Sequence, residues 1–307
     1  MATSRDYFSA FDWPRRSVPT SSTYSDGHPL DAVQYREYKI ILRPERFADP
    51  DGFHAFGKLV RDTAHDLGVA VSHKEAPAGD RLREILFYDT ARFALYESSS
   101  ILRRRTPHRD GWPTADPELT IKFRHPDLEK AAAVDVRPAT ERSYRIKFKE
   151  ELLPPRDRPG GIRSLFSHSC VLTAPSAHLD ADIGHALRVF PALREVLERA
   201  GPQLEVVQEA RMTEVLEPIG VLDFGHGVEG KVDLAVWRRH AIGAALIAEL
   251  GYQLRFTRDE ESHKKARKRA DDLFVHLQTA AHSWLALGIT KTAVVYGLGK
   301  TAPRHHE

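Results

Sequence analysis

The stretch SYRIKFKEEL, residues 143–152, alternates apolar and charged side chains with a period of two. Successive side chains of a β-strand point to opposite faces. This segment therefore has one apolar face and one basic face, and the basic face holds Arg145, Lys147 and Lys149. The stretch predicts a strand with one buried side and one cationic side.

The same design recurs along the chain. It is repeated in REYKIIL (36–42), ELTIKFR (118–124), GKVDLAVW (230–237) and ALIAELGYQLRF (245–256). A sheet with one solvated side explains any single strand of this kind, but solvated faces usually mix charges of both signs. Here the polar positions are mostly basic, with Lys39, Arg103, Arg105, Lys122, Arg124, Lys147, Arg211 and Lys231 against Glu37, Asp233 and Glu249.

This basic bias stands out because the net charge of the whole chain is only +2. Two like charges about 4 Å apart repel by roughly 4 kcal/mol at an effective dielectric constant of 20. Clustering them is unfavourable unless an anion binds between them. The pattern predicts a polyanion held in a cleft or tunnel. The few carboxylates are then suited to hold a divalent cation, since Mg²⁺ takes one or two carboxylates plus phosphate oxygens and water.

Helical periodicity and linker signals organise the rest of the chain. Residues 51–68 predict an amphipathic helix that Asp51 caps and Gly68 ends, and residues 260–287 predict a long C-terminal helix. Residues 176–200 predict a helical insertion that Pro191 interrupts, and residues 1–32, rich in Ser, Thr, Asp and Pro, predict a flexible N-terminal arm.

Composition narrows the class of protein. The chain of 307 residues is 41% hydrophobic, enough to build a sizeable core. No stretch approaches the roughly 18 apolar residues of a membrane span, and the N-terminus lacks an apolar signal segment. The single cysteine, Cys170, leaves no partner for an internal disulfide or a paired zinc site. We expect a cytoplasmic protein with no membrane partner.

One segment carries a family resemblance. YDTARFALYESSSILRRR, residues 88–105, closely resembles the signature of the CYTH family, or triphosphate tunnel metalloenzymes, in which Tyr/Phe-Asp-Thr and an Ala-Leu step precede a Leu-Arg-x-Arg strand. Further elements follow in the family's order: EYK at 37–39, Lys122 with Arg124, Arg211, Asp233 and LIAEL at 246–250. One position departs from it, since Tyr35 stands where the Glu-x-Glu-x-Lys motif has its first glutamate.

The resemblance implies an α+β fold, an eight-stranded antiparallel β-barrel tunnel with helices packed outside, formed by one domain over residues 33–300. It implies Mg²⁺ or Mn²⁺ as cofactor. Glu37 and Lys39 would be catalytic, and the metal ligands would be Glu37, Asp233 and Glu249. The substrate-binding residues would be Arg103, Arg105, Lys122, Arg124, Lys147 and Arg211.

The implied activity is hydrolysis of the terminal phosphoanhydride of an inorganic, thiamine or nucleoside triphosphate. Three alternatives stay open. The first is a non-catalytic module that binds polyphosphate or an RNA 5′-triphosphate, for which the loss of a glutamate at Tyr35 is an argument. The second is an adenylate cyclase of class IV type. In the third, the barrel is a scaffold for a partner protein.

Overall fold

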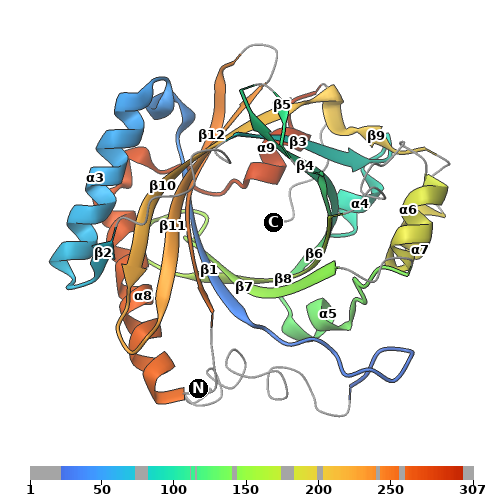
Figure 1. Ribbon diagram of the computed structural model, residues 1–307, viewed down its shortest axis with the longest axis horizontal. Coiled ribbons are helices and arrows are strands. Elements are labelled where there is room, and N and C mark those ends of the chain that lie inside the picture. The colour runs from blue at the N-terminus through green and yellow to red at the C-terminus, as the bar shows by residue number, and fades with distance from the viewer. Residues whose placement is uncertain are drawn as a thin grey trace.

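The computed structural model describes residues 22–72, 82–110, 112–114, 116–139, 144–173, 183–198, 203–239, 243–255 and 260–299. A barrel dominates this part of the chain (Figure 1). Its wall follows the order β1 (Tyr35–Leu42), β7 (Tyr144–Leu153), β8 (Arg163–Thr173), β6 (Glu118–His125), β4 (Ser100–Arg109), β3 (Leu82–Asp89), β10 (Met212–Asp223), β11 (Glu229–Arg239) and β12 (Ala245–Arg255), which pairs with β1 again.

The predicted α+β barrel with helices outside is confirmed, but the strand count differs. Nine strands, within the described residues, close the wall instead of eight. An odd number of strands cannot alternate in direction all the way around a closed barrel. At least one neighbouring pair must therefore be parallel, and β1 with β7 is that pair. Three short strands lie outside the wall: β2 (Ala70–Ser72), β5 (Trp112–Pro113) and β9 (Glu205–Val206).

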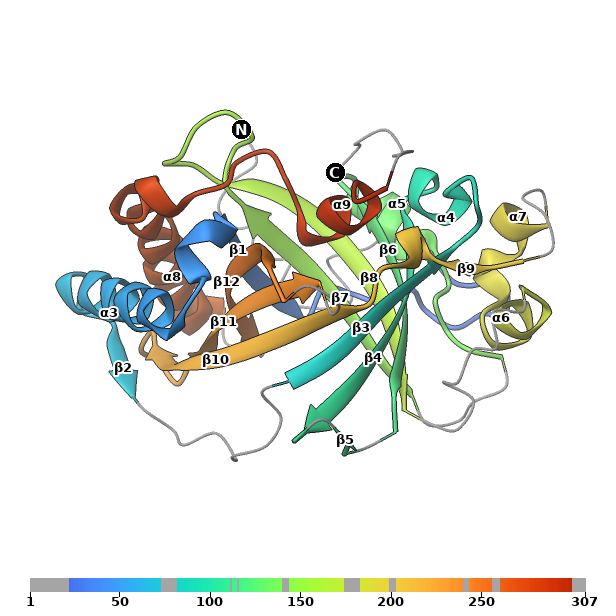
Figure 2. The ribbon, with the colours of Figure 1, turned by 90° about the horizontal axis from the view of Figure 1, so that it is seen from above.

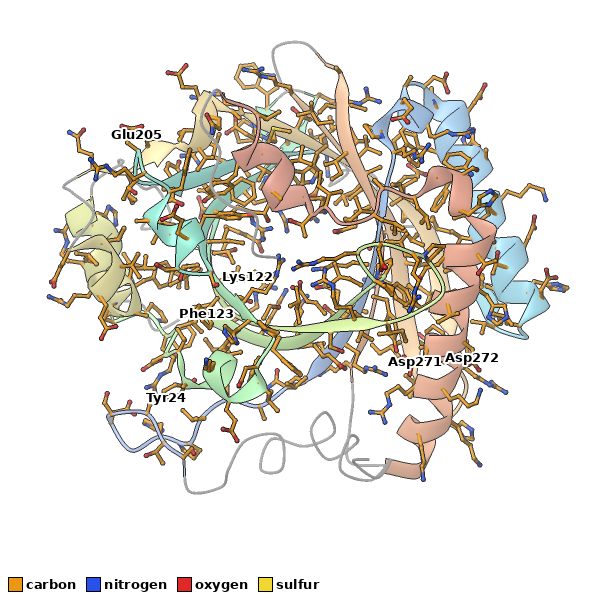
Figure 3. All side chains as sticks on the ribbon, turned by 180° about the vertical axis from the view of Figure 1, so that it is seen from behind. Tyr24, Lys122, Phe123, Glu205, Asp271 and Asp272 are labelled. Carbon is orange, nitrogen blue, oxygen red and sulfur yellow. The ribbon has the colours of Figure 1, made fainter. Side chains whose placement is uncertain are left out.

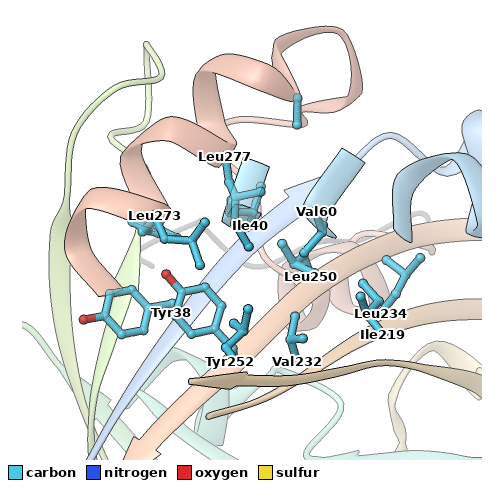
Figure 4. Packing of buried hydrophobic residues seen from close by; sticks show 14 of the residues in the cluster. Tyr38, Ile40, Val60, Ile219, Val232, Leu234, Leu250, Tyr252, Leu273 and Leu277 are labelled. Carbon is cyan, nitrogen blue, oxygen red and sulfur yellow. The ribbon is translucent and has the colours of Figure 1, made fainter. Parts of the chain in front are cut away.

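The apolar faces of the strands point outward, toward the helices. On β1, Tyr38, Ile40 and Leu42 are buried in a core against α3 (Pro50–Asp66) and α8 (Glu260–Ala280) (Figure 4). The rings of Tyr38 and Tyr252 stack with centroids 4.5 Å apart. The polar face is left for the inside of the barrel, and Figure 3 shows Lys122 directed into it while Phe123 points away.

A buried ion-pair network also fastens α8 to the wall. Arg36, almost fully buried on the outer face of β1, contacts Glu150 at 2.6 Å and Asp271 of α8 at 3.1 Å. Asp271 also accepts a hydrogen bond from the Tyr38 hydroxyl at 2.8 Å. A buried arginine with two carboxylate partners satisfies the requirement that buried charges be paired.

Helix α3 begins two residues earlier than its sequence pattern predicted. Asp49, not Asp51, is the N-cap, and its carboxylate accepts from the backbone N–H groups of Asp51 and Gly52. Pro50 then takes the first helical position, where its missing N–H has no consequence. The other end agrees with the prediction, because Gly68 has φ +67° just past the helix.

A second core lies on the opposite side of the barrel. It is covered by α4 (Ala94–Glu97), α6 (Ile183–Val189) and α7 (Arg194–Leu197) (Figure 2). Helix α6 stops before Pro191, which opens a 3-10 turn at Pro191–Leu193, so the predicted interruption is confirmed. Beneath the barrel, α5 (Leu128–Ala133) packs on Ala32 and Val33. The first 21 residues of the predicted arm lie outside the described residues.

The long C-terminal helix is shorter than predicted. Helix α8 ends at Ala280, a 3-10 turn follows at His282–Trp284, and α9 (Lys291–Tyr296) then lies across one end of the barrel (Figures 1 and 2). No helix among the described residues is both long and apolar enough to cross a membrane.

Candidate active site

The inside of the barrel holds a cavity of about 190 Å³. Its lining contains eight basic side chains, Lys39, Arg103, Arg105, Lys122, Arg124, Lys147, Lys149 and Lys291. It contains four acidic ones, Glu37, Glu118, Glu151 and Glu249. The strands deliver them because every second residue of β1, β4, β6 and β7 faces inward. The described part of the cavity is therefore strongly cationic.

One half of the cavity is a carboxylate–lysine cluster, formed by Glu37, Lys39, Lys122, Arg124, Lys149 and Glu151. Lys39 Nζ lies 2.8 Å from Glu37 Oε2 and 3.1 Å from Glu151 Oε1. Glu37 and Glu151 are register partners in the parallel β1–β7 pair, which is why one amine can bridge them. Lys122 and Arg124 bind Glu151 from β6, and Lys149 Nζ binds Glu37 Oε1 at 3.0 Å.

Burial and mutual pairing set the charges in this cluster. Burial alone would raise the pKa of Glu151, but Arg124, Lys122 and Lys39 outweigh it and hold that pKa well below its usual range. Burial would likewise lower the pKa of Lys39, but Glu151 and Glu37 raise it overall. Lys122 differs, because burial and Arg124 together lower its pKa to about 7. One amine of the cluster thus titrates near neutrality.

Beside the cavity lies Glu214, on β10, which does not itself line it. Its buried carboxylate accepts a hydrogen bond from Trp237 Nε1 at 2.9 Å and lies 3.5 Å from Arg83 Nη1 and 3.7 Å from Arg105 Nε. Lys291 of α9 also approaches, with its Nζ 2.8 Å from Glu249 Oε1 and 4.9 Å from the centre of the Trp237 ring. Burial and then Arg105 lower the pKa of Arg103 here to about 9.

Helix α9 closes one end of the cavity. Thr290, Lys291 and Thr292 line the cavity from this helix. Behind them Val295 and Tyr296 pack into an apolar cluster with barrel residues that include Ile41, Phe87, Ile101 and Trp237. The opposite end, which we call the mouth, is bordered by Arg105, Glu118 and Lys147. The side chain of Glu118 is 32% exposed, so solvent reaches the cavity there.

Asp89 of the Tyr-Asp-Thr motif holds this closure together and does not line the cavity. Its carboxylate accepts hydrogen bonds from the backbone N–H groups of Thr90, Leu95 and Tyr96 at 2.7 to 3.0 Å. It also accepts from the Tyr296 hydroxyl at 3.0 Å. The residue therefore ties β3, α4 and α9 to one point.

Most of the residues predicted to form the site meet in this cavity. Those brought together are Glu37, Lys39, Arg103, Arg105, Lys122, Arg124, Lys147 and Glu249. Arg211 is not among them, since its side chain is 60% exposed and pairs with Glu84, which also pairs with Arg104. Asp233 does not line the cavity either. Burial raises the pKa of its carboxyl group, and the nearby Lys231 and Arg83 offset only part of this rise.

The three predicted metal ligands do not form one cluster. In the part of the chain that the structure describes, no three His, Cys, Asp or Glu side chains stand close enough to hold a metal ion. The donor set that does fit a divalent cation is the pair Glu37 and Glu151, whose oxygens share Lys39 Nζ. Mg²⁺ commonly uses two carboxylates and completes its shell with phosphate oxygens and water.

Four charged residues of the lining, Glu118, Lys149, Glu151 and Lys291, were missing from the predicted site. Glu151 and Lys149 continue the period-two pattern of SYRIKFKEEL, so extending that alternation to its last inward position would have found both. Lys291 carries no such signal, and neither does Glu214 beside the cavity. Lys291 opens a short helix, and only the path of the chain after α8 brings it to Glu249.

Comparison with known proteins gives structural neighbours only. No protein-family model and no curated protein matches the chain. Among solved structures, it is similar to the putative adenylyl cyclase HpAC1 from Hippeastrum, described as having a dominant triphosphatase activity, at 16% identity and TM-score 0.42 over 86% of this chain and 95% of that one.

Two bacterial putative adenylate cyclases are also similar. The protein from Bacillus halodurans has 15% identity and TM-score 0.36, with coverage of 84% of this chain and 97% of that one. The protein from Vibrio parahaemolyticus has 10% identity and TM-score 0.34, with coverage of 85% and 97%.

Proposed function

We propose that the barrel binds a triphosphate-bearing molecule and hydrolyses its terminal phosphoanhydride with the help of Mg²⁺ or Mn²⁺. The observation that carries this proposal is the cavity lining, in which basic side chains outnumber acidic ones by eight to four. Phosphoryl transfer asks a protein mainly to position groups and to neutralise charge on phosphate oxygens. A basic cavity closed at one end suits both tasks.

The basic residues divide between two kinds of contact. Arg103, Arg105 and Arg124 offer planar guanidinium groups that can bond two phosphate oxygens at once. Lys122 and Lys147 add mobile point charges from β6 and β7, the two strands that flank β8. A bound phosphate chain would take over contacts that Glu151 and Glu214 now make with these cations.

The residues that would hold the metal are Glu37 and Glu151, at the place where Lys39 now bridges them. A divalent cation there would neutralise phosphate charge and help to orient a water molecule. Without a metal, Glu151 and Glu37 raise the pKa of Lys39 and keep it protonated. A cation bound to these two carboxylates would displace the ammonium group toward the phosphate. Lys39 therefore serves as a cation that positions phosphate and not as a base. Lys291 would hold a phosphate oxygen at the closed end.

Phosphate release from tripolyphosphate, ATP and thiamine triphosphate with Mg²⁺ or Mn²⁺ tests the proposal. We expect turnover of at least one substrate, and we expect Glu37→Gln and Arg103→Ala each to reduce kcat/KM by about a hundredfold or more. Arg211→Ala is the matched control, because its side chain pairs with Glu84 away from the cavity. Absence of turnover on all three substrates would contradict the hydrolase.

A non-catalytic binding module is the second candidate. The observation in its favour is that the lumenal carboxylates Glu37, Glu151 and Glu249 are all engaged by lysines. Tight binding of polyphosphate or of an RNA 5′-triphosphate that weakens with salt, without phosphate release, would favour it. Formation of cyclic AMP from ATP would instead indicate a cyclase.

A further inference from the structure

Strand β4 runs on past the mouth of the cavity. Its ladder with β6 ends where Arg105 faces Glu118. Its pairing with β3 continues as far as His108, opposite Leu82. The short strand β5 then folds back on the end of β4. We call these three strands the lip, and β5 lies beside the end of β4 at the end of the barrel opposite α9 (Figure 2).

Trp112 lies on the lumenal side of this lip. Arg103 and Arg105 line the cavity, and Arg109 continues the same face of β4 at a spacing of two. Arg109 is the register partner of Trp112 on β5, and directly opposed residues share a face. The indole is 76% exposed, twice as much as any other large apolar side chain described as exposed.

The closed end of the cavity decides which part of a substrate reaches this lip. Because α9 and the apolar cluster behind it lie at one end, a triphosphate ester would enter from the mouth with its terminal phosphate first. Its organic group is then left at the mouth. Arg109 lies four positions along the strand from Arg105, about 13 Å at 3.3 Å per residue.

We propose that Trp112, with Arg109 beside it, is a stacking platform for the planar heterocycle of a triphosphate ester. The proposal rests on the triphosphate function argued above and deepens it, because it makes organic triphosphates better ligands than inorganic tripolyphosphate. Base–aromatic stacking tolerates different rings, since every ring has a π-face. Arg109 can cover a neutral ring from the side, whereas a cationic ring would contact only the indole.

Binding calorimetry on the full chain with Trp112→Ala and Trp112→Phe tests the platform. With Trp112→Ala we expect the affinity for ATP or thiamine triphosphate to fall about tenfold and the affinity for tripolyphosphate to stay unchanged. Trp112→Phe should restore most of the loss. Trp237 lines the cavity and can respond to any triphosphate, so the relevant signal is the extra quenching of tryptophan fluorescence by the preferred ester over tripolyphosphate. This extra quenching should disappear in Trp112→Phe, which reports contact independently of turnover.

Two further variants sharpen the result. Ile162→Ala is the matched control, because Ile162 is also exposed but lies between β7 and β8 at the α9 end of the barrel. Arg109→Ala should weaken the binding of ATP but not that of thiamine triphosphate, because Arg109 would cover a neutral ring and not a cationic one. The platform is overturned if Trp112→Ala lowers the affinity for tripolyphosphate as much as the affinity for the esters, or if it lowers the affinity for neither ester. If the wild type binds no triphosphate at all, both the platform and the proposed function are contradicted.

Discussion

Single residues in this barrel owe their chemistry to neighbours that are remote in sequence. Lys122 and Lys39 both contact Glu151, yet their pKa values move in opposite directions. Lys39 lies between two carboxylates, whereas Lys122 also has Arg124 beside it on the same strand. Position among charges, and not residue type, therefore decides which amine titrates near neutral pH.

The low pKa of Lys122 predicts a pH dependence of binding. Its folded-state pKa of about 7 lies below the ordinary lysine value, so the amine loses its charge as pH rises through 7. We expect the affinity for tripolyphosphate to fall about three- to tenfold between about pH 6 and pH 8. Lys122→Arg should remove this component because arginine stays charged, whereas titration of the ligand itself is common to both proteins.

Calorimetry across that pH range measures the difference between the two proteins. If the wild type and Lys122→Arg show the same pH profile, Lys122 does not titrate in the free cavity.

A second residue-scale prediction concerns the segment before β1. Asp31 Oδ2 lies 3.0 Å from His168 Nε2 and accepts a hydrogen bond from the Tyr24 hydroxyl at 2.8 Å. Burial would raise the pKa of Asp31, but His168 and Tyr24 outweigh it and lower it overall. This contribution to stability is present above the unfolded pKa and is lost as pH falls through the folded pKa.

We therefore expect Asp31→Asn to destabilise the protein by about 1–3 kcal/mol at neutral pH and by less in acid. Urea unfolding at both pH values measures this. Asp62→Asn, which removes an exposed pairing with Lys58, should cost less than about 0.5 kcal/mol. A cost for Asp31→Asn no larger than that of the control would contradict the anchoring role.

At the scale of elements, two short helices are held by one carboxylate. Helices α4 and α9 are too short to be stable by themselves. Asp89 satisfies free N–H groups of α4 and binds Tyr296 of α9, whose ring also stacks on Tyr96 at 4.3 Å. The Tyr-Asp-Thr motif thus supports the end of the cavity and not its lining.

This arrangement predicts a graded loss of stability. Asp89→Asn places an N–H₂ group against donors and should cost about 3 kcal/mol, while Tyr296→Phe removes one hydrogen bond and should cost about 1 kcal/mol. Denaturant unfolding gives both values. Tyr144→Phe, on a partly exposed ring, is the control and should be neutral. Equal effects of Asp89→Asn and Tyr144→Phe would refute the anchor.

In the barrel as a whole, most apolar side chains of the strands face outward under the helices, and many charged side chains face the lumen. Helices α3 and α8 cover one flank and the α4–α6–α7 group covers another, so the outer faces of the strands are buried by helices. The lumen is left polar, and lumenal carboxylates pair with the lumenal cations when no ligand is bound. A bound polyanion would take over some of these ion pairs while the barrel stays folded.

That architecture predicts stabilisation by ligand. Tripolyphosphate at about a hundred times its Kd should add about 2.7 kcal/mol, a rise in Tm of several degrees. Raising the salt concentration should reduce the rise by screening. Arg103→Ala should fold normally and lose most of it, while Arg211→Ala should keep it. A rise that Arg103→Ala fully retains would place the ligand outside the barrel.

The sequence by itself determined which residues face inward and what charge they carry. The period-two alternation in β1, β6 and β7 is local, so the cationic lumen and the meeting of Lys39, Lys122 and Arg124 could be predicted, while the family resemblance added Arg103 on β4. Helix α3 and the break at Pro191 are equally local. The wrong cap at Asp51 is a displacement of two residues within one turn.

Only the tertiary structure decided how the strands meet. The ninth strand, the parallel β1–β7 pair and the contact of Glu37 with the Glu151 cluster all depend on pairing between segments more than a hundred residues apart. The placement of Lys291 beside Glu249 and of Arg211 toward Glu84 also depends on the tertiary structure. Alternation sets the face of a side chain, but strand register and closure set its neighbours, and these are not encoded in any local pattern.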